Sequence, residues 1–311
     1  MAAADLPVSV VIPAYNYAHF LREAVDSVLN QTHPWVELIV VNDGSTDNTK
    51  DILDSYGDRI VAVHQQNQGL SAARNTGIRA ASHDFIAFLD ADDVWEPDKL
   101  ACQMARFAEL PDGYGLVACD RGVIYRDGQR RPEEIAFRKT RLTSRELTAA
   151  DLLMRSHFSP SSVVARRACF DTCGLFDPAL RSTEDRDMWI RIAEHWRLFW
   201  DERVLCYIRK HGDNMSANAP RMKRNMLTVL RAARQRNRDR FRAPLFWRRV
   251  FAFLHFQVAW MHYESGHRGK AVGELLLSWL CSPWLRNPAQ LDELFLFRLR
   301  SLRLFLTKSP K

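Results

Sequence analysis

The feature that most constrains the fold is a regular alternation of short apolar runs and helix-like stretches over residues 8–89. Runs rich in β-branched and other apolar residues at 8–12, 36–41, 60–63 and 85–89 predict strands. Helical spacing of apolar residues predicts helices at 20–31, 51–56 and 69–81. Strands that alternate with helices at this pace form parallel β-α-β units. We therefore expect an α/β fold with a mostly parallel sheet flanked by helices.

Polar residues directly follow three of these predicted strands. Pro13-Ala14-Tyr15-Asn16 follows the first, Asn42-Asp43-Gly44-Ser45 follows the second, and Asp90-Ala91-Asp92-Asp93 follows the strand at 85–89. Ligands of such sheets bind beyond the carboxyl ends of the strands. The sequence therefore predicts one binding site built from three separate loops.

The third loop places the carboxylates of Asp90, Asp92 and Asp93 close together. Like charges this close raise each other's pKa unless a cation lies among them. Oxygen ligands suit Mg²⁺ or Mn²⁺, and Mg²⁺ often takes one or two carboxylates together with substrate phosphates. The cluster predicts a divalent metal shared with a diphosphate. The alternative is that Asp92 or Asp93 caps a helix that begins near Trp95.

The remainder of the chain gives coarser predictions. We expect strands at 115–124, 159–164 and 205–209, a helix at 184–196, and an exposed loop or hairpin at 126–146. The chain reads as helical from Met222 onward. The longest uncharged apolar stretch, Val250 to Tyr263, is too short to span a bilayer. With no secretion signal at the N-terminus, we expect a cytoplasmic protein whose six cysteines are reduced.

The motifs PAYN, VVNDGSTD, GLSAARNTGI and FLDADDVWEPDKL, in this order, resemble family 2 glycosyltransferases of bacterial type. The resemblance continues through Gly174–Asp177, Thr183–Asp185 and Tyr207–Ser216, and it covers about residues 7–216. It implies a catalytic domain at 1–216 with the GT-A-type nucleotide-sugar-binding fold. It also implies inverting, metal-assisted transfer of a sugar from a UDP- or dTDP-type donor to a hydroxyl of a glycan or lipid-linked acceptor. Such an enzyme would serve cell-envelope polysaccharide biosynthesis.

The resemblance also assigns roles to individual residues. Asp185 would be the general base that deprotonates the acceptor hydroxyl, with Glu184 on the acceptor side. Asp92 and His211 would hold Mn²⁺ or Mg²⁺. Asp43 would accept a hydrogen bond from a uracil or thymine N–H, which cytosine lacks at N3. The donor-binding set would comprise Pro13, Ala14, Tyr15, Asp43, Arg74, Asp90, Ala91 and Asp92.

Several readings stay open beside these assignments. Asp43 could serve an Asx-turn, Arg74 could be an ordinary exposed helix arginine, and Glu184-Asp185 could be a charged helix start. Arg186 stands where the family often has an aromatic residue, and the QxxRW pattern of processive synthases is absent. The alternative functions are a sugar nucleotidyltransferase and a non-catalytic nucleotide-sugar-binding or scaffold protein.

The charge of the chain divides near residue 216. The net charge of +7 is the sum of −7 over residues 1–215 and +14 over residues 216–311. We expect 217–311 to form a basic helical extension with one degenerate helical hairpin that turns at Gly266. The extension carries many arginines at 221–249, and arginines mixed with leucines and phenylalanines at 295–306. This pattern favours the anionic inner face of a membrane as a partner. The alternative is a solvated basic face, and nucleic acid is unlikely as a partner because no nucleic-acid module is recognised.

Overall fold

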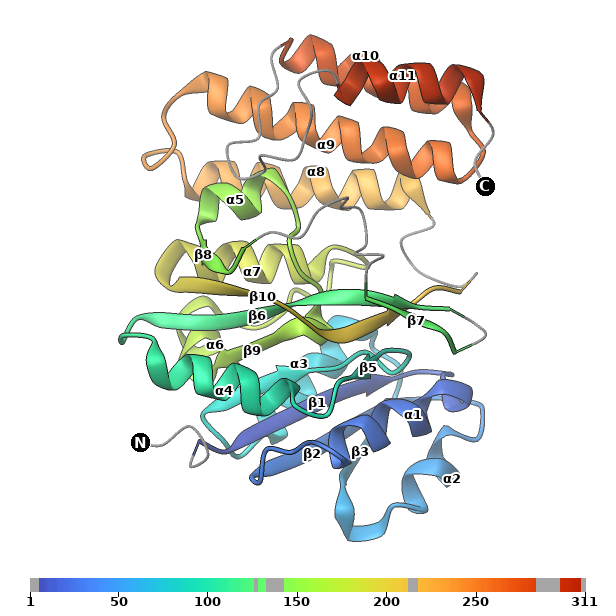
Figure 1. Ribbon diagram of the computed structural model, residues 1–311, viewed down its shortest axis with the longest axis vertical. Helices are drawn as coiled ribbons and strands as arrows, with labels where there is room; N and C mark the ends of the chain where they lie inside the picture. Colours follow the sequence, from blue (N-terminus) through green and yellow to red (C-terminus); the bar gives the residue numbers. More distant parts are fainter. Residues whose placement is uncertain (1–5, 126–127, 133–142, 212–217, 284–296, 309–311) are drawn as a thin grey trace. The chain divides into compact units, whose positions relative to one another are not determined.

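A computed structural model describes residues 6–125, 128–132, 143–211, 218–283 and 297–308 (Figure 1). The chain divides into two compact units. The first comprises Met1–Thr148 and Phe158–His211, and the second comprises Ala149–His157 and Gly212–Lys311. The predicted boundary at 216, and parts of the predicted loop at 126–146, lie outside the described residues.

The first unit is built on a ten-stranded sheet with the order β3-β2-β1-β4-β9-β6-β10-β5, to which β7 and β8 add at β6 and β10. Its parallel part, β3-β2-β1-β4, follows the predicted β-α-β units. A second parallel pair, β6 and β10, is joined to it through the antiparallel strand β9. The strands are β1 Val8–Ala14, β2 Val36–Asp43, β3 Val61–Gln65, β4 Phe85–Phe88, β5 Val94–Trp95, β6 Tyr114–Ile124, β7 Arg130–Arg131, β8 Arg145–Leu147, β9 Val163–Arg166 and β10 Arg197–Arg209.

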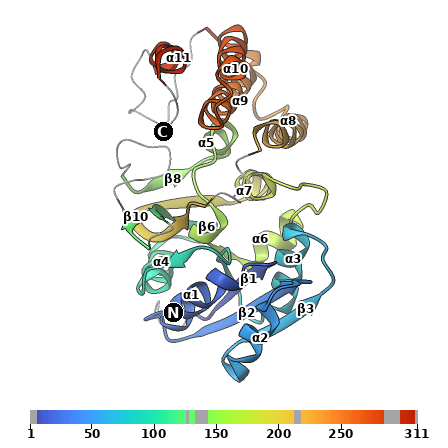
Figure 2. The same ribbon diagram turned by 90° about the vertical axis from the view of Figure 1, so that its right-hand side faces the viewer.

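Helices flank the sheet, so the predicted α/β class is confirmed (Figures 1 and 2). Every residue of β1 is buried, as expected for a central parallel strand. Helix α3 packs so closely on β1 that a Cβ on Gly77 would lie 2.2 Å from Val11 Cγ1, which explains a glycine within that helix. The helices of this unit are α1 Ala18–Leu29, α2 Thr49–Asp54, α3 Leu70–Ala80, α4 Lys99–Glu109, α6 Arg167–Cys173 and α7 Glu184–His195, with short 3-10 turns η2 Gly57–Arg59 and η3 Pro160–Ser162.

Two local predictions need correction. Val94–Trp95 forms β5, and α4 begins only at Lys99 with Asp98 at its N-cap, so the reading in which Asp92 or Asp93 caps a helix at Trp95 is wrong. The last strand, β10, begins at Arg197 and not at residue 205. Its first half pairs with β6 and β8. This half of β10 mixes polar and apolar residues, so the sequence pattern alone does not predict it as a strand.

The described part of the second unit is helical. It consists of α5 Ala149–Met154, α8 Ala219–Arg236, α9 Pro244–Glu264, α10 Arg268–Cys281 and α11 Phe297–Thr307. Gly266 lies in the turn between α9 and α10 with a φ of 79°, a conformation that favours glycine. Tyr263, Ala271 and Phe305 share the core of the α9, α10 and α11 helices. No helix among the described residues is both long and apolar enough to span a membrane. All six cysteines are free.

Candidate active site

The parallel strands bring the three predicted loops to one edge of the sheet. Ala14 at the end of β1 is paired with Asn42 of β2, and Val11 of β1 with Phe88 of β4. The residues that follow β1, β2 and β4 therefore leave the sheet side by side (Figure 1). Pro13 and Ala14 are buried as the last residues of β1, and Ala91 is buried beyond β4.

Backbone and side-chain hydrogen bonds join the first two loops. The Asn16 amide donates to Ser45 Oγ at 3.0 Å, and the Thr46 amide donates to Asn16 Oδ1 at 2.7 Å. Asn16 has a φ of 56°, which asparagine tolerates better than most residues. This linkage leaves the neighbouring Tyr15 side chain 45% exposed, in a position where it can stack on a ligand.

Asp43 is buried at the end of β2, and its carboxylate accepts three hydrogen bonds. Oδ1 accepts from Gln65 Nε2 at 2.7 Å and from the Gln68 amide at 2.9 Å, and Oδ2 accepts from the Gly69 amide at 2.8 Å. A carboxylate has about four acceptor sites, so Oδ2 can accept one more donor. The Asx-turn reading does not describe these contacts, because the partners lie 22 to 26 residues along the chain. The base contact stays a prediction.

Arg74 lies on α3 and is almost completely buried, at 1% exposure. Its Nη1 donates to Glu184 Oε1 and its Nη2 donates to Asp90 Oδ1, both at 2.6 Å. The guanidinium also lies 5.5 Å from the centre of the Phe176 ring. Arg74 is therefore not an exposed helix arginine. It cross-links the loop after β4 to the start of α7, and the predicted diphosphate contact is not tested by this geometry.

The loop after β4 is a tight turn in which the Asp93 amide donates to the Asp90 carbonyl at 3.0 Å. Asp93 is buried, where Ser161 Oγ and the Arg209 amide donate to its carboxylate. Burial and the nearby Asp92 and Asp90 raise its pKa well above the ordinary value. The buried Asp93 side chain thus anchors the turn to the protein interior. Asp90 and Asp92, which are less buried, lie at the edge of the sheet.

Asp92 is the residue that the structure joins to His211. Its Oδ2 lies 2.8 Å from His211 Nε2. The imidazole packs against the rings of Tyr17 and Phe20 at centroid distances of 5.7 and 5.5 Å. Burial and the charge of Asp90 raise the pKa of Asp92, although the hydrogen bond to His211 acts in the opposite direction. The two predicted metal ligands are therefore in direct contact.

These residues suit a divalent cation in part. Among residues 6–125, 128–132, 143–211, 218–283 and 297–308, no group of three or more His, Cys, Asp or Glu side chains is arranged to hold a metal. Asp92 and His211 supply one oxygen and one nitrogen donor, a set that fits Mn²⁺ or Mg²⁺ only when substrate phosphates and water complete the coordination. The donor set thus agrees with a metal that binds together with a diphosphate.

Helix α7 places Glu184 and Asp185 in its first turn, as the sequence predicts. Glu184 is engaged with Arg74, whereas Asp185 accepts a hydrogen bond from the Arg186 amide at 2.7 Å and forms no ion pair with any described residue. Burial and the adjacent Glu184 raise the pKa of Asp185 to about 6, although Arg74 lowers it. A carboxylate with this pKa is ionised at neutral pH and can accept a proton.

Several residues that shape the site are assigned no role by the sequence analysis. Gln65 and Ser161 orient Asp43 and Asp93, and Arg209 donates its Nε to the Asp92 carbonyl at 2.8 Å. Thr183, directly before Glu184, has a φ of 62°, which is strained for a β-branched residue. Arg209 lies two residues before the predicted metal ligand His211, and this position could have indicated that it belongs to the site. The others lie in segments whose placement depends on the tertiary fold.

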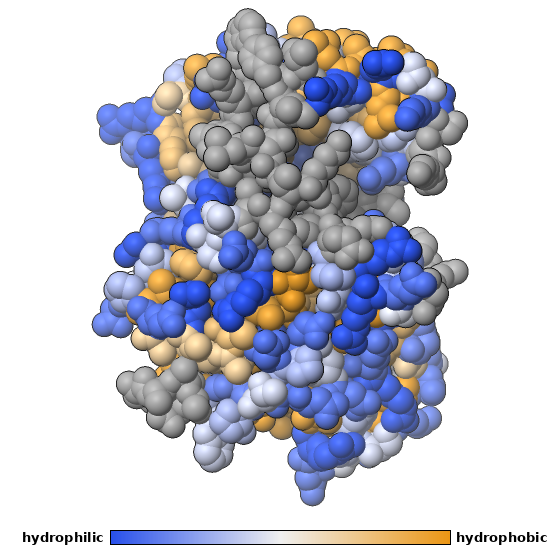
Figure 3. Space-filling view, viewed as in Figure 1, coloured by the Kyte–Doolittle hydropathy of each residue, from blue (hydrophilic) through white to orange (hydrophobic). Residues whose placement is uncertain are grey.

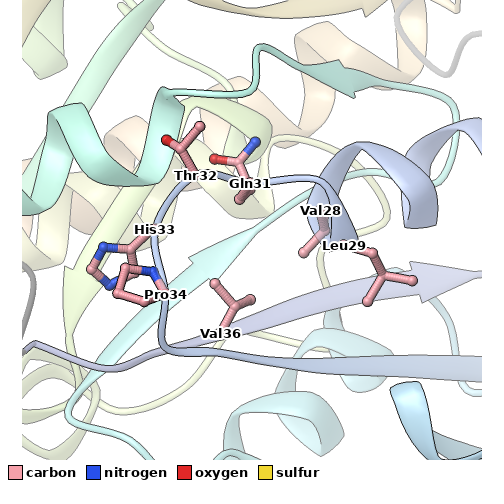
Figure 4. A pocket seen from close by; sticks show the side chains of 7 residues that line it. All are labelled: Val28, Leu29, Gln31, Thr32, His33, Pro34 and Val36. Carbon is pink, nitrogen blue, oxygen red and sulfur yellow. The ribbon is translucent and has the colours of Figure 1, made fainter.

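A surface hollow lies at the opposite end of the parallel strands (Figure 4). It is found where α1 ends and β2 begins, and His33 Nε2 in its wall lies 2.9 Å from the Leu6 carbonyl. No cluster of ionisable groups converges on it among the lining residues, so it is not part of the site described above. The residues around it are Val28, Leu29, Gln31, Thr32, His33, Pro34 and Val36.

Known proteins with similar sequences carry the same type of domain. The family model described as glycosyl transferase family 2 matches residues 9–174. An uncharacterized glycosyltransferase of Rickettsia prowazekii is 34% identical over 207 residues, which is 66% of this chain and 64% of the relative. Chondroitin synthase of Pasteurella multocida is 31% identical over 241 residues, covering 74% of this chain and 23% of that protein. The chain thus matches less than two thirds of the length of these relatives.

Solved structures share the fold at low sequence identity. The mannosyltransferase PcManGT from Pyrobaculum calidifontis, in complex with GDP-Man and Mn²⁺, has a TM-score of 0.64 and 21% identity, covering 98% of this chain and 86% of its own. TarS residues 1–349 of S. aureus, in complex with UDP-GlcNAc, has a TM-score of 0.58 and 17% identity, covering 90% of this chain and 93% of its own. The match of the family model over more than half of the chain shows that the protein belongs to glycosyl transferase family 2.

Proposed function

We propose that the first unit is an inverting glycosyltransferase that moves a sugar from a nucleoside-diphosphate sugar to a hydroxyl of a glycan or lipid-linked acceptor. The observation that carries this proposal is the Arg74 cross-link. One buried guanidinium joins Asp90, at the predicted donor edge, to Glu184, beside the predicted base. The two halves of the predicted site are therefore parts of one continuous charged network.

The donor half would be formed by the loops after β1, β2 and β4. Tyr15 would stack on the base, and Asp43 would accept its N–H through the remaining site on Oδ2. Uracil and thymine have such an N–H, and so does guanine at N1. The similar structures contain UDP-GlcNAc and GDP-Man, which supports testing all three base types for this chain.

In the acceptor half, the carboxylate of Asp185 would take the proton of the acceptor hydroxyl. The hydroxyl oxygen forms a bond to the anomeric carbon as the bond from that carbon to the diphosphate oxygen breaks, so the configuration inverts in one displacement. Glu184 is held by Arg74, which leaves Asp185 as the carboxylate of this pair available for proton transfer. General-base assistance of this kind contributes about 10²- to 10⁴-fold to the rate.

Asp92 and His211 would hold a divalent cation together with the diphosphate of the donor. Such a cation would supply charge neutralisation of the leaving nucleoside diphosphate. The buried turn at Asp93 fixes the position of Asp92 before the donor binds. We further propose that the protein works in the cytoplasm, at the inner face of a membrane when the acceptor is lipid-linked.

Product analysis tests this proposal. The full chain is incubated with UDP-, dTDP- and GDP-sugars and Mn²⁺, and a thermal-shift panel first selects the donor that binds. Release of nucleoside diphosphate with an inverted glycosidic product supports glycosyl transfer. Release of pyrophosphate would identify a nucleotidyltransferase. Metal-dependent donor binding without turnover on any acceptor pool would favour a non-catalytic binding protein.

A further inference from the structure

The second unit carries an unusual outer surface on α10. The exposed positions of this helix recur every three to four residues, at 269–270, 273, 276–277 and 280, and they include three leucines. Leu280 is 75% exposed, Leu276 is 51% exposed and Leu277 is 40% exposed. A single exposed leucine on a protein surface is ordinary, but three on one helix face indicate an interaction site. The other exposed positions of α10 are Gly269, Lys270 and Gly273.

Helix α11, which packs against α10, continues this character. Leu299 and Leu306, seven residues apart, are 51% and 63% exposed. Arg300 and Arg303 are exposed on the same helix. Figure 3 shows apolar surface with adjoining hydrophilic side chains over these helices. We call Leu276, Leu277, Leu280, Leu299 and Leu306 the leucine surface.

Buried contacts hold α11 in place against the end of α10. Arg298 donates from Nη1 to the Ser282 carbonyl at 2.9 Å and from Nη2 to the Pro283 carbonyl at 2.6 Å. The Phe305 ring stacks on the Tyr263 ring at a centroid distance of 4.7 Å. The exposure of Leu299 and Leu306 is thus a property of a packed helix. Because α11 is held in this orientation, the two leucines do not contribute to the core of the unit.

The exposed charges of residues 218–308 favour an anionic partner for the leucine surface. In the parts of 218–308 that the structure describes, the exposed acidic residues are Asp239 and Glu264, and Glu274 is buried against Lys223 and His255. The exposed basic residues are far more numerous. They are Arg224, Arg231, Arg234, Arg236, Arg238, Arg240, Arg242, Arg248, Lys270, Arg300, Arg303 and Lys308.

This charge pattern decides between two occupants of the leucine surface. A second copy of the chain would bring the same excess of arginines against the first, and like charges across an interface are unfavourable. An anionic bilayer offers hydrocarbon for the leucines and phosphate for the arginines at the depth that each side chain reaches. Basic residues near such a surface are attracted by its negative potential.

We propose that the leucine surface of α10 and α11 inserts into an anionic phospholipid bilayer, with Lys270, Arg300 and Arg303 at the headgroups. The proposal deepens the proposed function, because it would bring the enzyme to a lipid-linked acceptor. It differs from the sequence expectation by placing insertion on α10 as well as α11. The arginines of 221–249 then contribute long-range attraction without being the inserted element.

Vesicle co-sedimentation of the full chain tests this placement. The probes are vesicles of phosphatidylcholine alone and of phosphatidylcholine with phosphatidylglycerol, at low salt and at about 0.15 M salt. We expect the wild-type protein to sediment with the anionic vesicles, and Leu280→Glu to lower the bound fraction roughly tenfold. The matched control is Leu245→Glu, an equally drastic change at a leucine that is 50% exposed at the start of α9, outside the leucine surface. This control should bind like the wild type.

A second pair of variants separates insertion from diffuse attraction. Arg300→Glu with Arg303→Glu should weaken binding several-fold more than Arg231→Glu with Arg234→Glu, which changes the same number of exposed charges on α8. Equal losses in the two variants, or equal losses in Leu280→Glu and Leu245→Glu, would overturn the placement. So would an absence of wild-type binding to anionic vesicles at both salt concentrations.

Two controls keep the result interpretable. Sedimentation velocity reports self-association, and a wild-type dimer that Leu280→Glu dissociates without any change in vesicle binding would assign the surface to a second copy and refute the proposal. Thermal melting with and without the donor reports folding and the first unit separately. Failure of donor binding with intact vesicle binding would refute the proposed function and leave the membrane surface standing.

Discussion

Each unit contains a histidine–carboxylate pair, and the two pairs have different surroundings. In the first unit, Asp92 Oδ2 lies 2.8 Å from His211 Nε2, and in the second, Glu274 Oε2 lies 2.7 Å from His255 Nδ1. Lys223 also donates to Glu274. Burial raises the pKa of Glu274, but the hydrogen bonds with His255 and Lys223 outweigh this effect. The pKa of Glu274 is therefore below its ordinary value. The pKa of Asp92 moves in the opposite direction, because burial and Asp90 outweigh His211.

The first pair belongs to the proposed ligand site, and the second is a structural cluster. Glu274 has its cation within the fold, so the cluster ties α8, α9 and α10 together and is electrostatically complete. Asp92 shares its surroundings with a second acid, and the nearby arginines are committed elsewhere, Arg74 to Glu184 and Asp90, and Arg209 by an ion pair to Glu23. The same pair of residue types is therefore a brace in one unit and, in our proposal, half of a binding site in the other.

The largest effect that would test this contrast is the loss of the buried cross-link. Arg74→Met leaves the carboxylates of Asp90 and Glu184 without their cation, and breaking a buried ion pair from one side destabilises by about 3–5 kcal/mol. We expect denaturant unfolding to show this loss. The control is Arg197→Met, whose bidentate pair with Glu146 is exposed and should leave the unfolding midpoint almost unchanged. Equal losses would mean that Arg74 is not the organiser of the site.

The two histidine–carboxylate pairs can be compared directly by amide substitution. Asp92→Asn should lower turnover about ten- to a hundredfold, equivalent to about 1.4–2.7 kcal/mol, and should raise the Mn²⁺ concentration that half-saturates the enzyme. Glu274→Gln should leave turnover per folded molecule unchanged and lower the melting temperature. A chelator should reproduce the first effect in the wild-type protein. If both substitutions affect only stability, the contrast between brace and binding site is wrong.

The smallest effect concerns two residues with the same left-handed backbone. Thr183 before α7 has a φ of 62°, and Gly266 in the second unit has a φ of 79° with open space at its Cβ position. Thr183→Gly should relieve strain and raise the free energy of unfolding by up to about 1 kcal/mol. Gly266→Thr should lower it by about 1–2 kcal/mol. Calorimetric melting checks both, and a loss in both variants would show that Thr183 is not strained.

The parallel half of the first unit could be predicted well from the sequence. Its strands are short, apolar and separated by amphipathic helices, so local pattern and tertiary structure agree. The ends of β1, β2 and β4 follow from the same pattern, and with them the neighbourhood of Tyr15, Asp43 and Asp92. The turn at Gly266 could also be predicted, because glycine there breaks a helical pattern.

The remainder of the site depends on contacts that no local pattern encodes. Arg74 looks like any helix arginine until α7, 110 residues later, brings Glu184 against it. Ser161 and Arg209 reach Asp93 from segments 68 and 116 residues away. The exposure of Leu280 could not be seen either, since the spacing of leucines in α10 is equally compatible with a buried helix. These features arise from packing and not from propensity.

The most direct test of the account is the turnover of Asp185→Asn as a function of pH. In the wild-type enzyme, Asp185 must be ionised to accept a proton, and its pKa of about 6 predicts that turnover falls as the pH drops below about 6. Asp185→Asn should retain metal-dependent donor binding, unfold at the same or a higher temperature because a partly buried charge is removed, and lose about 10²- to 10⁴-fold in turnover at neutral pH. Wild-type turnover in this variant, with the acidic limb unchanged, would contradict the account.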